Sequence, residues 1–196
     1  EIGGMQNLMW GLANELSKNY MIRVFADYHE NHKEFDEQVS FSIERVGGLK
    51  LLRKYRKAQL INEFIKENKI EGIIADHWKS LELLKTSKKK ICLIHGKEIN
   101  HEKGTSLNKR VLEVLNNVET VVANSEYTKD LAIELGVKED KIVVINPGVD
   151  KVEELDKKTL DKVDNLLKHK SPRLITVSRF DKRKNHEKVI MALRNL

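Results

Sequence analysis

The chain has 196 residues, of which 40% are hydrophobic and 34% charged, enough for one full α/β domain and the start of another. Its net charge of +6 is the difference between 36 basic and 30 acidic residues, and the basic residues are not interleaved with aromatic stacking platforms, which argues against a nucleic-acid partner. No apolar run approaches the roughly 18 residues that a membrane-spanning helix needs.

Helix and strand patterns alternate along the chain. Apolar residues recur at helical spacing between Met5 and Leu16, which predicts an amphipathic helix over residues 5–18. Ser125 and Gly136 stand where an N-cap and a C-terminal glycine would bound a helix over residues 126–135. Further strands are predicted at residues 22–26, 39–43, 72–75, 90–94, 119–123 and 142–145, and further helices at 49–69 and 106–117.

This repeated order, with nearly uniformly apolar strands, predicts a parallel, doubly wound, Rossmann-like α/β sheet that is covered on both faces. The single cysteine, Cys92, lies inside such an apolar strand, which predicts a buried structural thiol in a reducing cytoplasm. Gly3 and Gly4 precede the first helix at the position of a strand-to-helix phosphate loop, yet no strand precedes them. Because the first strand of such a sheet is usually central, its loss would leave two unpaired edges, and we expect a trimmed piece of a longer protein.

The domain organisation follows from a change in composition after residue 150. Residues 1–150 form the predicted Rossmann-like domain without its first strand, and residues 151–171 are a charged connector or solvated helix. Residues 172–196 begin a new strand–helix unit, in which an apolar strand runs into a loop that carries Arg179 and Lys184. Two cations beside a helix N-terminus suit an anion such as a diphosphate.

Four stretches together resemble the retaining nucleotide-sugar glycosyltransferases of family four, which have the two-Rossmann GT-B architecture. The residues that carry the resemblance are Gly3–Leu16, Ile91–Glu98, the segment Thr120–Glu126 with Leu131, Gly136 and 141–150, and Val177–His186. The resemblance implies transfer of a sugar from a nucleotide-diphosphate donor to a sugar or lipid acceptor with retention of configuration. It also implies that residues 1–150 are the acceptor side and that residues 172–196 open the nucleotide-sugar-binding domain.

The resemblance also assigns the site residues. Arg179 and Lys184 match the pair that binds the donor diphosphate, and Gly3 and Gly4 match the loop that approaches the same phosphates. His95 matches the histidine near the transferred sugar, so the expected catalytic residues are His95, Arg179 and Lys184. Such enzymes typically bind no divalent metal, and we expect no cofactor besides the donor. The family's paired glutamates have no counterpart in this chain, which is therefore expected to be inactive alone.

Asp76, His77 and Trp78 follow another strand, and we regard them as acceptor-side candidates, although a strand cap and a packed aromatic explain them equally well. A non-catalytic nucleotide- or sugar-binding module of the same fold is the alternative to an enzyme. A nicotinamide dehydrogenase is disfavoured because the chain has no Gly-x-Gly-x-x-Gly, although Asp27 could be a ribose ligand. The spacing of the nearby histidines and glutamates matches no helical zinc motif, and we expect no metal site there; these residues are His95, Glu98, His101 and Glu102.

The basic segment at residues 49–67 offers a second surface. In this segment lysines and arginines stand beside leucines. Such a pattern is typical of an amphipathic helix that rests on anionic lipid, and it is equally typical of an ordinary surface helix whose apolar stripe faces the sheet. The cations of this segment are Lys50, Arg53, Lys54, Arg56 and Lys57. We therefore expect a cytoplasmic protein for which peripheral contact with the inner face of the membrane is an open alternative.

Overall fold

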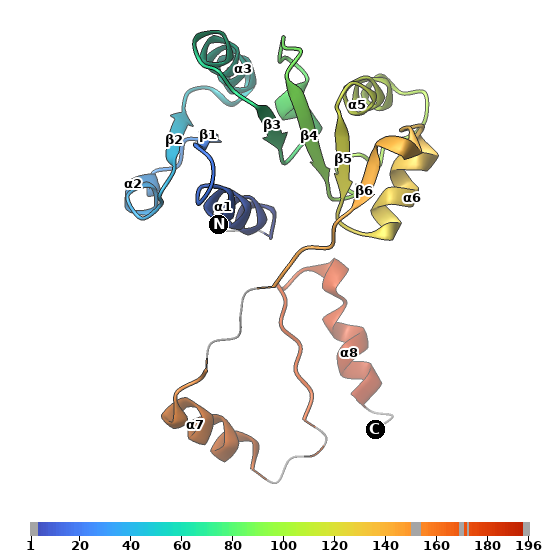
Figure 1. The fold of residues 1–196 in the computed structure, drawn as a ribbon. Coiled ribbons are helices and arrows are strands. Elements are labelled where there is room, and N and C mark those ends of the chain that lie inside the picture. Colours follow the sequence, from blue (N-terminus) through green and yellow to red (C-terminus); the bar gives the residue numbers. More distant parts are fainter. Residues whose placement is uncertain (1–3, 150–153, 169–170, 172, 194–196) are drawn as a thin grey trace. The chain divides into compact units, whose positions relative to one another are not determined.

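The protein is described from a computed structural model, which describes residues 4–149, 154–168, 171 and 173–193. The chain divides into two compact units, Glu1–Gly148 and Val149–Leu196. In the first unit helices and parallel strands alternate (Figure 1). Its strands are β1 (Arg23–Asp27), β2 (Ser42–Val46), β3 (Gly72–Ala75), β4 (Lys89–Ile94), β5 (Thr120–Ala123) and β6 (Ile142–Val144), and its helices are α1 (Gly4–Leu16), α2 (His32–Asp36), α3 (Lys50–Glu67), α4 (Trp78–Leu81), α5 (Ser106–Asn116), α6 (Glu126–Leu135) and a 3-10 turn (Glu139–Lys141).

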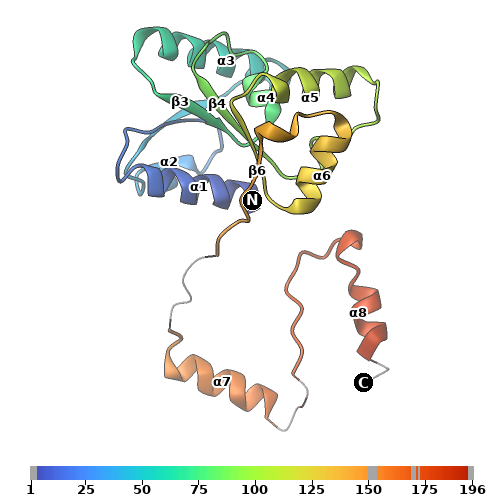
Figure 2. The ribbon, with the colours of Figure 1, turned by 45° about the vertical axis from the view of Figure 1, so that its right-hand side comes forward.

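The strands of the first unit form two parallel sheets instead of one. β1 pairs with β2, and the second sheet has the order β3-β4-β5-β6. Among the described residues, β1 and β3 therefore each have a single hydrogen-bonded neighbour. In both ribbon views β1 and β2 lie between α3 on one side and α1 on the other (Figures 1 and 2), so the α/β, Rossmann-like class is confirmed.

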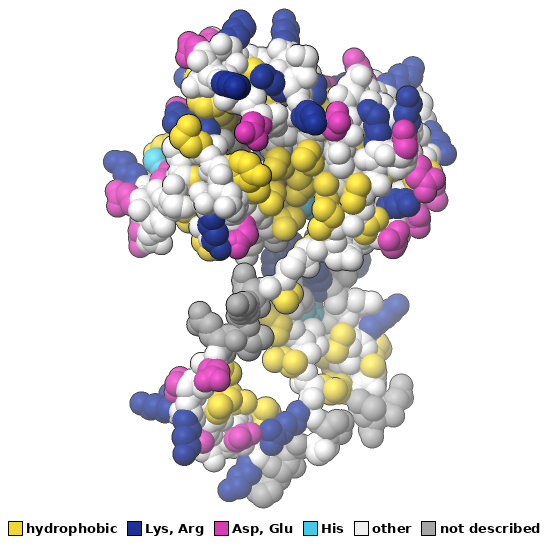
Figure 3. Space-filling view, in the orientation of Figure 1, with side chains coloured by type: hydrophobic (Ala, Val, Ile, Leu, Met, Phe, Trp, Pro, Cys, Tyr) yellow, Lys and Arg dark blue, Asp and Glu magenta, His cyan; other side chains and the backbone are white. Residues whose placement is uncertain are grey.

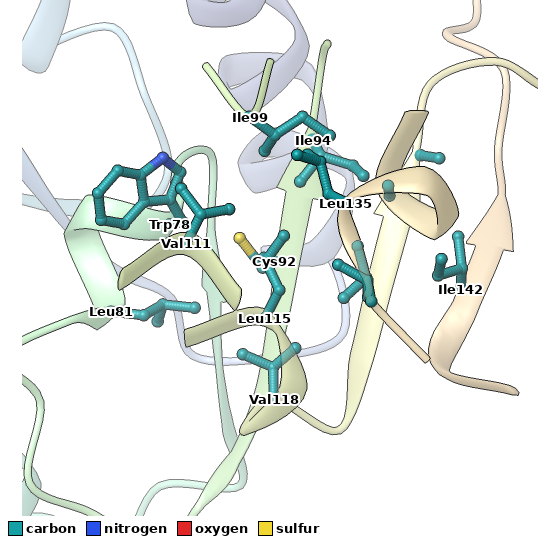
Figure 4. Close-up of a cluster of buried hydrophobic side chains, with 14 of the residues drawn as sticks. Trp78, Leu81, Cys92, Ile94, Ile99, Val111, Leu115, Val118, Leu135 and Ile142 are labelled. Atoms are coloured by element: carbon teal, nitrogen blue, oxygen red, sulfur yellow. The ribbon is translucent and has the colours of Figure 1, made fainter. Parts of the chain in front are cut away.

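The hydrophobic core belongs to the four-stranded sheet. Side chains from β3–β6 and from α4, α5 and α6 form one buried cluster, which includes Trp78, Cys92 and Leu115 (Figure 4). Cys92 is fully buried, as predicted, and burial raises the pKa of its thiol. In contrast, the 13-residue helix α1 buries only Ala13 and the 18-residue helix α3 buries only Ala58.

The N-terminal part of the unit is thus less well packed than the rest. Hydrophobic side chains gather over the middle of the first unit in Figure 3. On the edge strand β3, Ile74 remains 37% exposed. Helix α3 contacts β1, β2 and α4 and so connects the two sheets.

Local signals in the sequence set the ends of α6 as predicted. The Ser125 hydroxyl accepts a hydrogen bond from the Thr128 backbone N–H at 3.2 Å and caps the helix N-terminus. Gly136 adopts φ +107°, a left-handed conformation that glycine reaches without strain, and its N–H bonds to the Ala132 and Ile133 carbonyls.

Two strand predictions differ from the structure. Strand β2 begins at Ser42 instead of residue 39, and residues 173–178, within the apolar strand expected before the loop of Arg179, form none. The second unit contains α7 (Lys157–Leu167), a 3-10 turn (Lys182–Lys184) and α8 (His186–Ala192), and none of the described residues of these helices is buried. An apolar run needs a partner strand to become a sheet strand, and residues 173–178 have none among the described residues.

Candidate functional site

The carboxyl ends of β3 and β4 bring several polar side chains together. Asp76 and His77 directly follow β3, and His95 directly follows β4. Because adjacent parallel strands end at the same edge of a sheet, these residues share the edge where doubly wound sheets bind ligands. The charges of Glu98, Asp76 and His95 all act on the pKa of the His77 imidazole.

His95 begins a tight turn. Gly96 has φ +104°, and its carbonyl accepts hydrogen bonds from the N–H groups of Ile99 and Asn100 at 3.2 and 3.0 Å. The His95 backbone N–H donates to Glu98 Oε1 at 2.5 Å. The ring Nε2 of His95 is buried and has no hydrogen-bond partner among the described residues. Leaving a buried polar atom without a hydrogen bond lowers the stability of the fold by about 1–3 kcal/mol. The position of this nitrogen is therefore not explained by a hydrogen bond within the described chain.

His77 is held by the start of α4. Its Nδ1 accepts a hydrogen bond from the Lys79 backbone N–H at 3.1 Å, which makes it the side-chain cap of that helix. Burial lowers the pKa of His77, and the charge of Glu98 acts in the opposite direction. At neutral pH the imidazole is therefore uncharged. Its Nδ1 serves as a cap, as one of the two interpretations of this residue predicted.

Trp78 is fully buried and contributes to the core. Its Nε1 donates a hydrogen bond to the Glu98 carbonyl at 2.9 Å. Two cations flank the ring, with Lys79 Nζ 5.3 Å and Arg110 Cζ 5.5 Å from its centroid. The structure thus places Trp78 as a packed aromatic that connects the end of β3 with the turn after β4.

In the second unit Arg179 precedes the 3-10 turn that leads into α8, Lys184 is the last residue of that turn, and both side chains are exposed. The ring of His186, the first residue of α8, stacks on Phe180 with a centroid distance of 5.1 Å. His186 Nε2 lies 3.0 Å from the Arg179 carbonyl oxygen and 3.1 Å from Ser178 Oγ. These contacts order the loop that carries Arg179.

The glycine loop is described only in part. Gly3 lies outside the described residues, and Gly4 is the exposed first residue of α1 with open space around its Cα. An added side chain at Gly4 would therefore meet no atom of the described chain.

Asp27, the candidate ribose ligand of the dehydrogenase alternative, is bound by α3. Its carboxylate forms ion pairs with Lys57 and with Arg53 Nη1, the latter at 3.3 Å. Burial raises the pKa of Asp27, but the hydrogen bonds and charges of Lys57 and Arg53 outweigh it and lower the pKa below its usual value. A ribose hydroxyl would have to compete with two cations for this carboxylate.

The polar side chains at this edge are not arranged as metal ligands in the described part of the chain. Among the described residues no cluster of three or more histidine, cysteine, aspartate or glutamate side chains could hold a metal ion. A hollow of about 300 Å³ lies at the opposite edge, where the amino ends of β4 and β5 and the side chain of Lys141 line it. This hollow is remote from His77 and His95, and we assign the site to the carboxyl edge on the chemistry of its residues.

Comparison with known proteins identifies the family of this chain. The model of Glycosyltransferase Family 4 matches residues 2–153, and the chain belongs to this family. Three crystal structures of Anabaena HepE are similar in fold. The complex with UDP has 17% sequence identity and a TM-score of 0.64, and the complex with UDP and glucose has 16% identity and a TM-score of 0.62. The complex with UDP-glucose has 17% identity and a TM-score of 0.59. Each match covers 85% of this chain and 47% of HepE, so the chain spans about half the length of that protein. At this identity the likeness shows the fold, which is of the GT-B type. A comparison with curated proteins gave no match.

Sequence reasoning missed the part that Glu98 plays at this edge. The sequence gives Glu98 no role at this edge, whereas in the structure its Oε1 accepts a hydrogen bond from the His95 N–H and its carbonyl accepts one from Trp78 Nε1. A signal for this was present, because a glutamate three residues after His95, beyond a glycine, is placed to accept from a free N–H at a tight turn.

Proposed function

We propose that this chain forms the acceptor side and the opening of the donor side of a glycosyltransferase that uses a nucleotide-diphosphate sugar and retains the anomeric configuration. The observation that carries the proposal is the placement of Asp76 and His77 after β3 and of His95 after β4, at the carboxyl edge of the sheet, in a chain of Glycosyltransferase Family 4. The UDP and UDP-glucose in the HepE structures support a uridine-diphosphate sugar as the first donor to test.

In this proposal each residue acts through its charge or position. Arg179 and Lys184 bind the donor diphosphate and stabilise the negative charge that grows on it as the sugar departs. Both side chains are exposed in the second unit and so accessible to a ligand. His95 contacts the transferred sugar, the uncharged His77 borders the acceptor, and neither a metal nor a further cofactor takes part.

The test is a donor panel with the natural gene product that carries this sequence. We expect transfer from one nucleotide sugar, with an NMR coupling constant of the product that shows the anomeric configuration of the donor. Replacing Arg179 and Lys184 by alanine should lower kcat/KM by about 100-fold or more, whereas Lys182→Ala, an exposed lysine of the same turn, should change it little. Inversion of configuration would contradict the retaining mechanism, and saturable binding of a nucleotide sugar without any turnover would favour the non-catalytic module.

A second proposal concerns membrane contact through the start of α3. Leu49, Leu51, Leu52 and Tyr55 remain 74%, 86%, 54% and 60% exposed, so the first turns of this basic helix present an uncovered apolar surface. Leucine and tyrosine beside cations are typical of helices that lie in the interface of a bilayer. No helix in the described part of the chain is long and apolar enough to cross a membrane.

The ion pairs of α3 decide which substitutions test this proposal. Arg53 and Lys57 pair with Asp27, and Lys54 pairs with Glu82, so charge reversal at these positions would disturb the fold as well as lipid binding. Leu51→Glu with Leu52→Glu leaves these ion pairs in place and should abolish sedimentation with vesicles of phosphatidylglycerol and phosphatidylcholine.

A matched control lies on another exposed helix. Leu166→Glu replaces an 80% exposed leucine of α7 and should leave vesicle binding unchanged. Equal binding by the α3 double variant and by wild type would refute membrane contact through α3.

A further inference from the structure

We propose that Glu98 is a positioning residue that fixes His95 and joins the ends of β3 and β4 into one rigid edge. The proposal rests on the proposed function for the meaning of that edge, but its structural part stands on contacts alone. Glu98 belongs to no helix or strand, and it lies in the turn after β4.

Three hydrogen bonds meet at Glu98. Its Oε1 accepts from the His95 backbone N–H at 2.5 Å, and its carbonyl accepts from Trp78 Nε1 at 2.9 Å. The same carbonyl lies 3.0 Å from His101 Nε2, which can donate to it. Glu98 therefore connects His95 and His101, which lie on either side of it in the sequence, with Trp78, the first residue of α4.

The anchors of this network are rigid. Trp78 and Ile99, the neighbours through which the network meets the core, are both fully buried. Gly96 has φ +104°, where a side chain would be strained, so the turn has few alternative conformations. A charge-assisted hydrogen bond from a carboxylate to a turn N–H is stronger than one between neutral groups. Glu98 thus fixes the backbone from which the His95 ring projects.

The His95 ring gives this positioning a purpose. Its buried Nε2 has no partner, so no hydrogen bond of the described residues orients that end of the ring. The position of the ring therefore depends on the backbone that carries it, where Glu98 Oε1 accepts the hydrogen bond of the His95 N–H. Loss of this bond should allow the turn and the ring to move, and a displacement of about 1 Å can lower a rate by about 100-fold.

The negative charge of Glu98 has a second, separable effect. It raises the pKa of His77, against burial and against the positive charges of Lys79 and His95, while Asp76 acts in the same direction as Glu98. Glutamine at position 98 would keep an acceptor oxygen for the His95 N–H but remove the charge. Alanine would remove both, so the two variants separate positioning from electrostatics.

The experiment compares Glu98→Ala, Glu98→Gln and Glu102→Ala, the last at an exposed carboxylate of the same loop. In NMR spectra of this chain we expect Glu98→Ala to move the His95 amide resonance upfield and broaden its ring signals, and Glu98→Gln to leave both near wild type. The pKa of His77 should fall in both Glu98 variants and not in Glu102→Ala. If the alanine variant does not fold, the glutamine variant and the His77 titration still decide the electrostatic part.

The kinetic arm uses the natural gene product. We expect kcat to fall by about 10–100-fold in Glu98→Ala with KM nearly unchanged, and Glu98→Gln to restore most of it. A His95 amide resonance that is unmoved in Glu98→Ala, or a kcat equal to that of Glu102→Ala, would overturn the proposal. Absence of any transfer by wild type would instead refute the proposed function, while the His95 resonances would still report whether Glu98 positions the turn.

Discussion

Glu82 is the residue whose replacement should reveal most about how the first unit is held together. It follows α4 directly and accepts hydrogen bonds from Arg110 Nε and Nη2 on α5 at 2.6 and 3.0 Å. It also pairs with Lys54 on α3, so one carboxylate connects the helix beside β1 and β2 with the core of the four-stranded sheet. Glu82→Gln removes the charge while nearly preserving the shape of the side chain.

The magnitude follows from the pKa of Glu82. The hydrogen bond from Arg110, assisted by Lys54 and opposed by burial, lowers the pKa of this carboxyl from 4.5 to about 2. Because the Arg110 side chain is 45% exposed and solvent screens it, we discount the full shift and expect the pair to contribute about 1–2 kcal/mol at neutral pH. A folded-state pKa below the unfolded one gives stability that is present above pH 4.5 and is lost as the pH falls toward 2.

The assay is urea unfolding of wild type and Glu82→Gln at pH 7 and at pH 3.5. Trp10→Phe is introduced in both, so that the fluorescence reports on the buried Trp78. We expect the difference in free energy of unfolding to shrink by about 1 kcal/mol between the two pH values. Glu139→Gln is the control. The Glu139 carboxylate is 67% exposed and pairs with Lys129, so its replacement should change neither unfolding curve measurably.

Two results would refute this reasoning. A difference between wild type and Glu82→Gln that is independent of pH would show that shape and not charge is responsible. A difference near zero at pH 7 would show that the ion pairs contribute nothing beyond their desolvation cost.

Three further predictions concern single residues. Gly136→Ala should lower the free energy of unfolding by about 1–2 kcal/mol because φ +107° is strained for alanine. Gly11→Ala, in the interior of α1 with open space around it, should raise the free energy of unfolding by about 0.5–1 kcal/mol. Urea unfolding measures both. Ser125→Ala removes the acceptor of the Thr128 N–H and should cost about 1 kcal/mol, measured as a fall in Tm, with an unchanged Tm as the refuting result. Burial lowers the pKa of His77 below its unfolded value, so the contribution of the uncharged ring to the free energy of unfolding is present above about pH 6.5 and is lost as the pH falls. His77→Asn should therefore flatten the dependence of Tm on pH between 7 and 5. An equal slope in both proteins would contradict this.

The parts of the fold that local chemistry decides were predictable. Strand β3 occupies residues 72–75 as the apolar pattern predicted, and the cap and terminal glycine of α6 are where their residue types indicate. Strand β2 was wrong by three residues because its interior holds Glu44 and Arg45, which look unlike a strand. In the structure Arg23 and Asp36 pair with them, and such tertiary partners leave no trace in a local pattern.

The site shows the same limit. Because strands of a parallel sheet end at one edge, the grouping of Asp76, His77 and His95 could be expected from the order of elements alone. The burial of Trp78 and the hydrogen bonds of Glu98 depend on how a turn after β4 meets a helix after β3, twenty residues apart, and periodicity carries no information about such contacts. The strand expected before the loop of Arg179 was wrong for a related reason: residues 173–178 form none, since strand formation depends on a partner strand.

The division of the first unit into two sheets has a consequence for its motions. A two-stranded sheet is only marginally stable, and β1 and β2 are covered by α1 and α3, which bury one residue each. Residues 4–67 should therefore open as a subglobal unit while the β3–β6 core stays closed. Amide hydrogens of β1 and β2 would exchange with solvent well before those of β4 and β5. Within the first unit, limited proteolysis would cut residues 4–67 first and leave a resistant core that begins near Gly72.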